Sequence, residues 1–241
     1  MKLEKDSLIM IYKEAISIVK LFLDIDRYTV KKNIPVGFRQ LKKEIFTNDK
    51  YVIKFTNFKK NKGIDNYVYE NEAEYLKKLQ NFKFIPRFYG KYEENKNIYL
   101  VMEYLNGSSM DNLTFSEWFQ IKKNIDLLEE KLKYILNKFA ENNIIHRDLR
   151  PHNIVIIKSS IGFDVKVIDF QYMMELNKTT HIPKDSQIHY SKVMNNIGSI
   201  WRNKTLPLNS FENDEYAINK IIDDLKSKSL LSFIIDKIRG I

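Results

Sequence analysis

A carboxylate and an amide on one short stretch of the sequence have the spacing that phosphoryl transfer needs. Residues 144–155 read IIHRDLRPHNIV, and Asp169 ends an apolar run farther along the chain. Transfer of phosphate from ATP requires one carboxylate that orients the acceptor hydroxyl, and further groups that hold magnesium against the phosphates. Asp148 suits the first task, whereas Asn153 and Asp169 suit the second. These residues predict phosphoryl transfer from ATP, with Mg²⁺ as the metal.

The segments around these residues strengthen that interpretation. An apolar lead-in precedes Asp148, a strand-like run covers residues 153–157, and a second run covers 165–169. A lone His-Arg-Asp is common by chance, and Asp-Phe at a strand end could be a simple turn, but the joint pattern is specific. It resembles the protein-kinase catalytic loop H-R-D-L-x-x-x-N followed by the D-F-G motif. On these residues the chain is identified as a member of the protein-kinase-like superfamily.

The resemblance implies a lysine and a glutamate upstream. Residues 51–54 read YVIK and have the form of the V-A-I-K strand, whose lysine reaches the α- and β-phosphates of ATP, so Lys54 is expected to take that role. Glu72, in a segment with helical periodicity, is expected to hold Lys54 in position. Glu70 and Glu74 compete for this role, and the apolar residues that follow Glu72 favour it.

The end of the next apolar strand resembles the kinase hinge. Residues 98–107 read IYLVMEYLNG. By resemblance, Met102 would lie against the adenine, and the backbone from Glu103 to Leu105 would hydrogen-bond it. A buried strand that ends in a turn explains this segment equally well.

Several positions depart from the family pattern. Residues 33–50, before Lys54, contain a single glycine and no G-x-G-x-x-G, so backbone amides cannot approach phosphates closely there. Arg150 stands where a lysine is usual, and it is expected to stabilise charge on the transferred phosphoryl group. Gln171 stands where the D-F-G glycine would be, and no A-P-E follows. We therefore expect no on/off switch at this motif.

These departures indicate a compact, atypical branch similar to the bacterial heptose kinases of the lipopolysaccharide core. The short stretch after Asp169 leaves little room for a peptide-docking lobe, so the expected acceptor is a hydroxyl of a sugar, another small molecule, or a glycolipid such as lipopolysaccharide core. The RIO and aminoglycoside-phosphotransferase branches share the skeleton. A Ser/Thr protein kinase and a pseudokinase that acts as a binding or scaffold module stay open as alternatives.

Composition limits the compartment and the partners. The chain has no cysteine, which suits a reducing compartment, and its net charge of +9 comes mostly from lysine. Because no basic stripe is interleaved with aromatic residues, nucleic acid is not an expected partner. An apolar helical stripe over 8–23 predicts a helix packed on the small lobe or, second, one lying on a membrane surface. We expect a cytoplasmic protein. If the helix lies on a membrane surface, the protein would associate with the inner membrane face. We predict no oligomeric state.

The expected fold class is α+β, a two-lobed protein-kinase-like fold with Mg-ATP between the lobes. We expect an N-terminal amphipathic helix over residues 1–27, an N-lobe and hinge over 28–105, and a mostly helical C-lobe over 106–241. Strands are predicted near 40–46, 51–57, 86–93 and 97–104, followed by two short strands after the catalytic loop. Helices are predicted near 5–23, 66–80, 114–121, 124–141, 187–196, 212–227 and 229–239.

Overall fold

The chain forms two compact units. The first comprises residues 1–106, 166–172 and 181–190, and the second comprises 107–165, 173–180 and 191–241. The computed structural model describes residues 39–42, 45–56, 64–94, 97–160, 162–176, 200–207 and 209–239. The helices predicted over 5–23 and 187–196, and with the former the predicted membrane-surface stripe, lie outside these residues. Within the described part of the chain, no helix combines the length and the apolar character needed to span a bilayer.

The first unit is built on an antiparallel sheet of five strands in the order β1-β2-β3-β5-β4. The strands are β1 (Arg39–Lys42), β2 (Ile45–Thr47), β3 (Tyr51–Phe55), β4 (Phe88–Glu94) and β5 (Asn97–Glu103). The prediction of one strand over 40–46 is wrong, because Gln40 pairs with Phe46 and Lys42 with Ile45. The chain reverses direction there without a glycine or proline to mark the turn, so the apolar pattern gave no warning.

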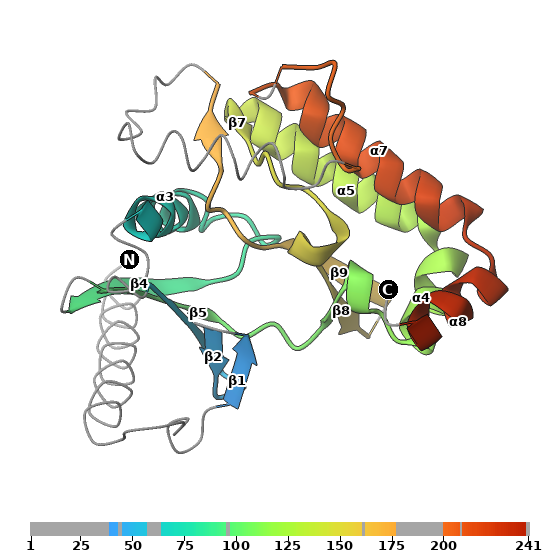
Figure 1. Cartoon of the computed structure of the whole chain (residues 1–241), viewed down its shortest axis with the longest axis horizontal. Coiled ribbons are helices and arrows are strands. Elements are labelled where there is room, and N and C mark those ends of the chain that lie inside the picture. The colour runs from blue at the N-terminus through green and yellow to red at the C-terminus, as the bar shows by residue number, and fades with distance from the viewer. Residues whose placement is uncertain are drawn as a thin grey trace. The chain divides into compact units, whose positions relative to one another are not determined.

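The helix α3 (Ile64–Lys78) packs against β4 and β5 of this sheet (Figure 1). Successive residues of a strand point to opposite faces, and β5 is buried from Ile98 to Met102, so both of its faces are covered. Leu76 of α3 is fully buried, as is Leu100 of β5. The strand β3, which carries Lys54, and the helix α3, which carries Glu72, therefore both contact β5.

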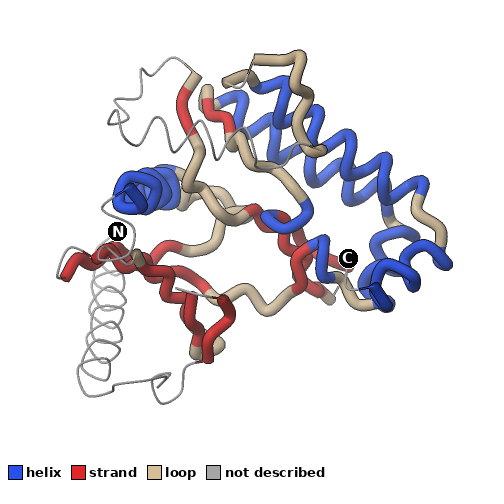
Figure 2. Tube along the Cα trace, viewed as in Figure 1, coloured by secondary structure: helices blue, strands red, loops and turns tan. Residues whose placement is uncertain are grey.

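Helices dominate the second unit, in which α5 (Ile125–Glu141) and α7 (Phe211–Ser227) run side by side (Figure 2). Both bury an apolar stripe at helical spacing, and Leu128, Leu132 and Phe139 of α5 are fully inaccessible to solvent. Short strands complete the unit: β7 (Ile144–Ile145) pairs with β10 (Met174–Glu175), and β8 lies between β6 and β9. Their bounds are β6 Ser108–Ser109, β8 Ile154–Ser159 and β9 Gly162–Val167.

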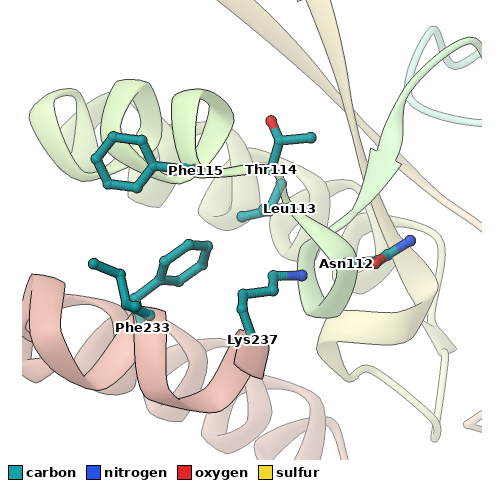
Figure 3. Close-up of a pocket in the computed structure, with 7 residues that line it drawn as sticks. Asn112, Leu113, Thr114, Phe115, Phe233 and Lys237 are labelled. Atoms are coloured by element: carbon teal, nitrogen blue, oxygen red, sulfur yellow. The ribbon is translucent and has the colours of Figure 1, made fainter. Parts of the chain in front are cut away.

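The last helix of the second unit, α8 (Leu230–Arg239), packs on α4 (Phe115–Lys123) through stacked rings. The Phe233 ring lies 4.8 Å from that of Trp118. Beside this contact is a hollow of about 560 Å³, lined by Phe115, Phe233, Lys237 and four other residues (Figure 3). None of the residues predicted to take part in catalysis lines it.

Candidate active site

Lys54, Glu72 and Asp169 form a cluster of ion pairs within the first unit. The Lys54 Nζ lies 2.7 Å from Glu72 Oε2 and 3.1 Å from Asp169 Oδ1. Lys54 comes from β3, Glu72 from α3 and Asp169 from the segment after β9. Of the three candidate glutamates, the structure therefore places Glu72 on the lysine, whereas Glu70 pairs with Lys91 at 2.6 Å.

Burial gives this cluster its electrostatic character. The Lys54 and Glu72 side chains are 12% and 2% exposed, and that of Asp169 is 27% exposed. Burial alone would lower the pKa of Lys54, but the Asp169 and Glu72 carboxylates outweigh that effect and raise the pKa. Lys54 thus keeps its proton at neutral pH and presents a fixed positive charge, as a phosphate-binding lysine must.

The backbone at Asp169 has an unusual conformation. Its φ of 67° lies in the left-handed region, which aspartate reaches at a cost of roughly 1 kcal/mol or more. The next residue, Phe170, is buried, and its N–H donates a hydrogen bond to the Glu72 carboxylate. Contacts to α3 therefore hold the strained turn that aims the Asp169 carboxylate.

The predicted hinge lies at the end of β5. Met102 is buried and pairs with Val52 of β3. The N–H of Glu103 donates to the carbonyl of Arg87 at 2.8 Å, so this N–H is not available to an adenine. The Glu103 carboxylate accepts from Lys166 Nζ at 2.6 Å. Of the predicted adenine contacts, the carbonyl of Glu103 and the backbone of Leu105, two residues past β5, are the ones compatible with this arrangement.

Asp148, Arg150 and Asn153 come together in the second unit. Asp148 is 5% exposed, and the Asn153 Nδ2 donates to its carbonyl oxygen at 2.9 Å and to its Oδ2 at 3.0 Å. The Arg150 Nε lies 3.3 Å from Asp148 Oδ1. The loop thus places a cation and an amide on the same carboxylate, and fixes the direction in which that carboxylate points.

Asp214, in the first turn of α7, braces this loop. It is 2% exposed, and its two carboxylate oxygens accept the N–H groups of His146 at 2.5 Å and Arg147 at 2.9 Å. Arg147 itself has a left-handed φ of 70°. Burial raises the pKa of Asp214 to about 6, although these two hydrogen bonds oppose the shift. A buried carboxylate from a helix therefore secures the strained backbone directly before Asp148.

The two predicted magnesium ligands have suitable oxygen atoms. The Asn153 Oδ1 is buried, and within the described part of the chain it has no hydrogen-bond partner. Such an atom is costly unless something binds it, and a cation would satisfy it. The Asp169 carboxylate uses one oxygen on Lys54 and is partly exposed. Carboxylate and amide oxygens are the donors that Mg²⁺ takes beside phosphates, so these residues fit that metal.

The sequence did not point to one contact near this cluster. The Asn71 Nδ2 lies 3.0 Å from the carbonyl oxygen of Gln171 and 3.4 Å from that of Phe170. Asparagine at this place in a helix is unremarkable as a sequence signal, and only its position beside Glu72 could have singled it out.

Comparison with known proteins supports the assignment of the fold. A family model described as "Protein kinase domain" matches residues 38–196. The chain is 30% identical over 175 residues to serine/threonine-protein kinase D of Synechocystis sp., a match that covers 72% of this chain and 33% of that protein. It is 29% identical over 170 residues to the dual specificity protein kinase TTK of Mus musculus, covering 67% and 19% respectively. For the dual specificity protein kinase zakA of Dictyostelium discoideum the identity is 32% over 127 residues, covering 46% and 15%. The chain thus spans a third or less of the length of these relatives. The match to the family model confirms the expected α+β protein-kinase-like fold.

Proposed function

Because the chain belongs to the protein kinase domain family, we propose that it is an ATP-dependent kinase that phosphorylates a serine or threonine hydroxyl of a protein. The observation that carries this proposal is the cluster of Lys54, Glu72 and Asp169. A lysine held by a buried glutamate, with a second carboxylate beside it, is the arrangement that phosphoryl transfer requires of the nucleotide-binding side.

The protein acceptor replaces the sugar acceptor that we expected from the sequence. The relatives described above are named as serine/threonine or dual specificity protein kinases, and none of their names mentions lipopolysaccharide. The expectation of a sugar acceptor rested on motifs that the chain lacks and on the short stretch after Asp169. Such missing features describe a subfamily less directly than residues that are present. A sugar or glycolipid hydroxyl becomes the acceptor to be tested against protein.

Each residue has a task that follows from its surroundings. Lys54 would contact the α- and β-phosphates, with Glu72 keeping its ammonium group in place. Asp148 would orient the acceptor hydroxyl and take its proton late, because the transition state of phosphoryl transfer is largely dissociative. Arg150, which already contacts Asp148, would lie where negative charge develops on the transferred group. The hinge backbone at Glu103 and Leu105 would hydrogen-bond the adenine beside Met102.

Asn153 and Asp169 would hold magnesium through the oxygens described above. When bound, Mg²⁺ neutralises charge on the phosphate oxygens and fixes their orientation. The Asn153 amide has two separate tasks in this proposal, because its Nδ2 already positions Asp148 and leaves Oδ1 for the metal.

A pseudokinase that serves as a scaffold is the alternative from another class. A protein without catalysis has no chemical need to keep the Lys54 ion pairs, the oriented Asp148 and the unsatisfied Asn153 oxygen together. The cost of burying these polar groups favours the active enzyme.

The test is phosphate transfer from labelled ATP to serine- and threonine-containing protein substrates, to free sugars and to core oligosaccharide. The controls are Asp148→Asn, and Asp164→Asn as a matched change at an exposed aspartate of β9. We expect protein labelling that Asp148→Asn abolishes and Asp164→Asn leaves intact. Labelling of sugars with proteins inert would overturn the proposed acceptor, and absence of any Asp148-dependent ATP turnover would overturn the kinase activity itself.

A further inference from the structure

We propose that Asn71 is a positioning residue that clamps the main chain after Asp169 and so fixes the Asp169 carboxylate for magnesium. This inference rests on the proposed kinase function and adds a positioning residue to the same site. It starts from two contacts within the first unit, in which the Asn71 Nδ2 approaches the carbonyl oxygens of Phe170 and Gln171 at 3.4 and 3.0 Å.

The chemistry of these contacts is unambiguous. Both partners are carbonyl oxygens, which only accept hydrogen bonds, and the NH₂ group of asparagine carries two donors. The amide can therefore reach two successive carbonyls at once. Asn71 is half-buried, which limits competition from water for these donors.

The clamp is completed by the next residue of the helix. The Glu72 carboxylate accepts the N–H of Phe170, so consecutive residues of α3 hold both the N–H and the carbonyl of Phe170. Glu72 also holds Lys54, which in turn contacts Asp169. Any displacement of the segment after Asp169 would break contacts to α3 on both sides of Phe170.

The segment needs such support because Asp169 has a left-handed φ of 67°. Without tertiary contacts, an aspartate would relax from this conformation and its carboxylate would turn away from Lys54. Gln171, two residues after Asp169, lacks the backbone freedom that a glycine would have at its position. The contacts from α3 and the glutamine at position 171 together keep the Asp169 carboxylate in the metal-binding arrangement, and no phosphorylation is needed to reach it.

The experiment compares the full chain with Asn71→Ala, Asn71→Gln and the control Glu74→Ala at an exposed position of the same helix. Alanine is a better helix former than asparagine, so a loss in Asn71→Ala does not come from a weakened helix. Two quantities are measured: the hydrogen exchange of the peptide that covers residues 166–172, and the Mg²⁺ concentration that gives half-maximal turnover.

We expect at least roughly fivefold faster exchange in Asn71→Ala and a rise of roughly five- to tenfold in the Mg²⁺ requirement, as loss of one or two part-buried hydrogen bonds to backbone carbonyls implies. Asn71→Gln, which keeps both donors, should recover part of each effect, and Glu74→Ala should match the wild type.

Unchanged exchange in Asn71→Ala would overturn the clamp, and faster exchange with an unchanged Mg²⁺ requirement would overturn its role in metal positioning. The exchange measurement needs no turnover. If the wild type shows no Asp148-dependent activity, the proposed function fails while the clamp is still decided.

Discussion

Replacement of Asp214 by asparagine tests whether a buried carboxylate holds the catalytic loop. Asp214 is 2% exposed and accepts two backbone N–H groups, from His146 and Arg147. An asparagine can accept one of these bonds with its oxygen, but it turns its NH₂ group toward the other donor. A buried N–H left without a partner costs about 1–3 kcal/mol, so Asp214→Asn should loosen the backbone before Asp148. We expect roughly a tenfold or greater loss in kcat at neutral pH.

The pKa of Asp214 adds a second, independent measurement. Burial raises this pKa to about 6 from its ordinary value of 3.8, so the folded state binds more protons than the unfolded state between these values. Stability therefore falls as pH rises through this window. The contribution of Asp214 to stability is fully present below its pKa in the unfolded state, and it is lost as the pH rises past its pKa in the folded state. Between about pH 4.5 and about pH 7 the loss from this group alone is about 2 kcal/mol.

Urea unfolding of the wild type and of Asp214→Asn at these two pH values isolates that contribution. The fall in unfolding free energy between the lower and the higher pH should be smaller in Asp214→Asn by about 2 kcal/mol. Asp223→Asn, an exposed carboxylate of the same helix, should keep the wild-type difference. If the unfolding free energy of Asp214→Asn falls between the two pH values as much as that of the wild type, and the variant retains full activity, Asp214 does not have the role that we assign to it.

Two further changes test the elements that position the site. Glu72→Gln removes the charge of the carboxylate that lies 2.7 Å from the Lys54 ammonium group, and it should lower kcat/KM at least roughly tenfold. Glu74→Gln, on the exposed side of α3, should leave kcat/KM unchanged. Equal losses of kcat/KM in both variants, measured by steady-state kinetics, would contradict the pairing. Gly107→Ala would place a Cβ atom 2.2 Å from the backbone oxygen of Ile156, so β6 must move away from β8. We expect the unfolding free energy to fall by about 2 kcal/mol or more, measured by urea unfolding, and a variant as stable as the wild type would show that this close approach is not required.

The sequence predicted the elements whose pattern is local. The alternating strand at residues 51–55 and the helical stripes of residues 125–141 and 211–227 appear in the structure close to their predicted places. The hairpin of β1 and β2 was missed, because strand pairing is a relation between segments and no turn residue marked the reversal. Periodicity gives the face of an element but not the point at which a chain folds back on itself.

The site shows the same division between local and tertiary information. Glu72 could be preferred over its neighbours because apolar residues follow it at helical spacing, and the structure pairs it with Lys54. From the sequence alone, Asp214 could also be interpreted as a helix N-cap, but the N-cap of α7 is Ser210 and Asp214 lies inside the first turn. The contacts of Asn71 could not be foreseen, since they join residues about 100 positions apart through hydrogen bonds that leave no periodic trace.

The departures from the family pattern become intelligible when the two carboxylates Asp148 and Asp169 are considered in turn. Asp148 follows Arg147, whose backbone is left-handed, and Asp169 has a left-handed backbone itself. Side chains from a helix secure the backbone at both positions. Asp214 accepts the N–H of Arg147, and Asn71 and Glu72 bind the peptide groups of Phe170. Strain of this kind persists only where surrounding contacts over-determine it. Hydrogen bonds from side chains of α3 and α7 provide these contacts in the structure. The absence of an on/off switch at a motif whose glycine is replaced by Gln171 stays a prediction.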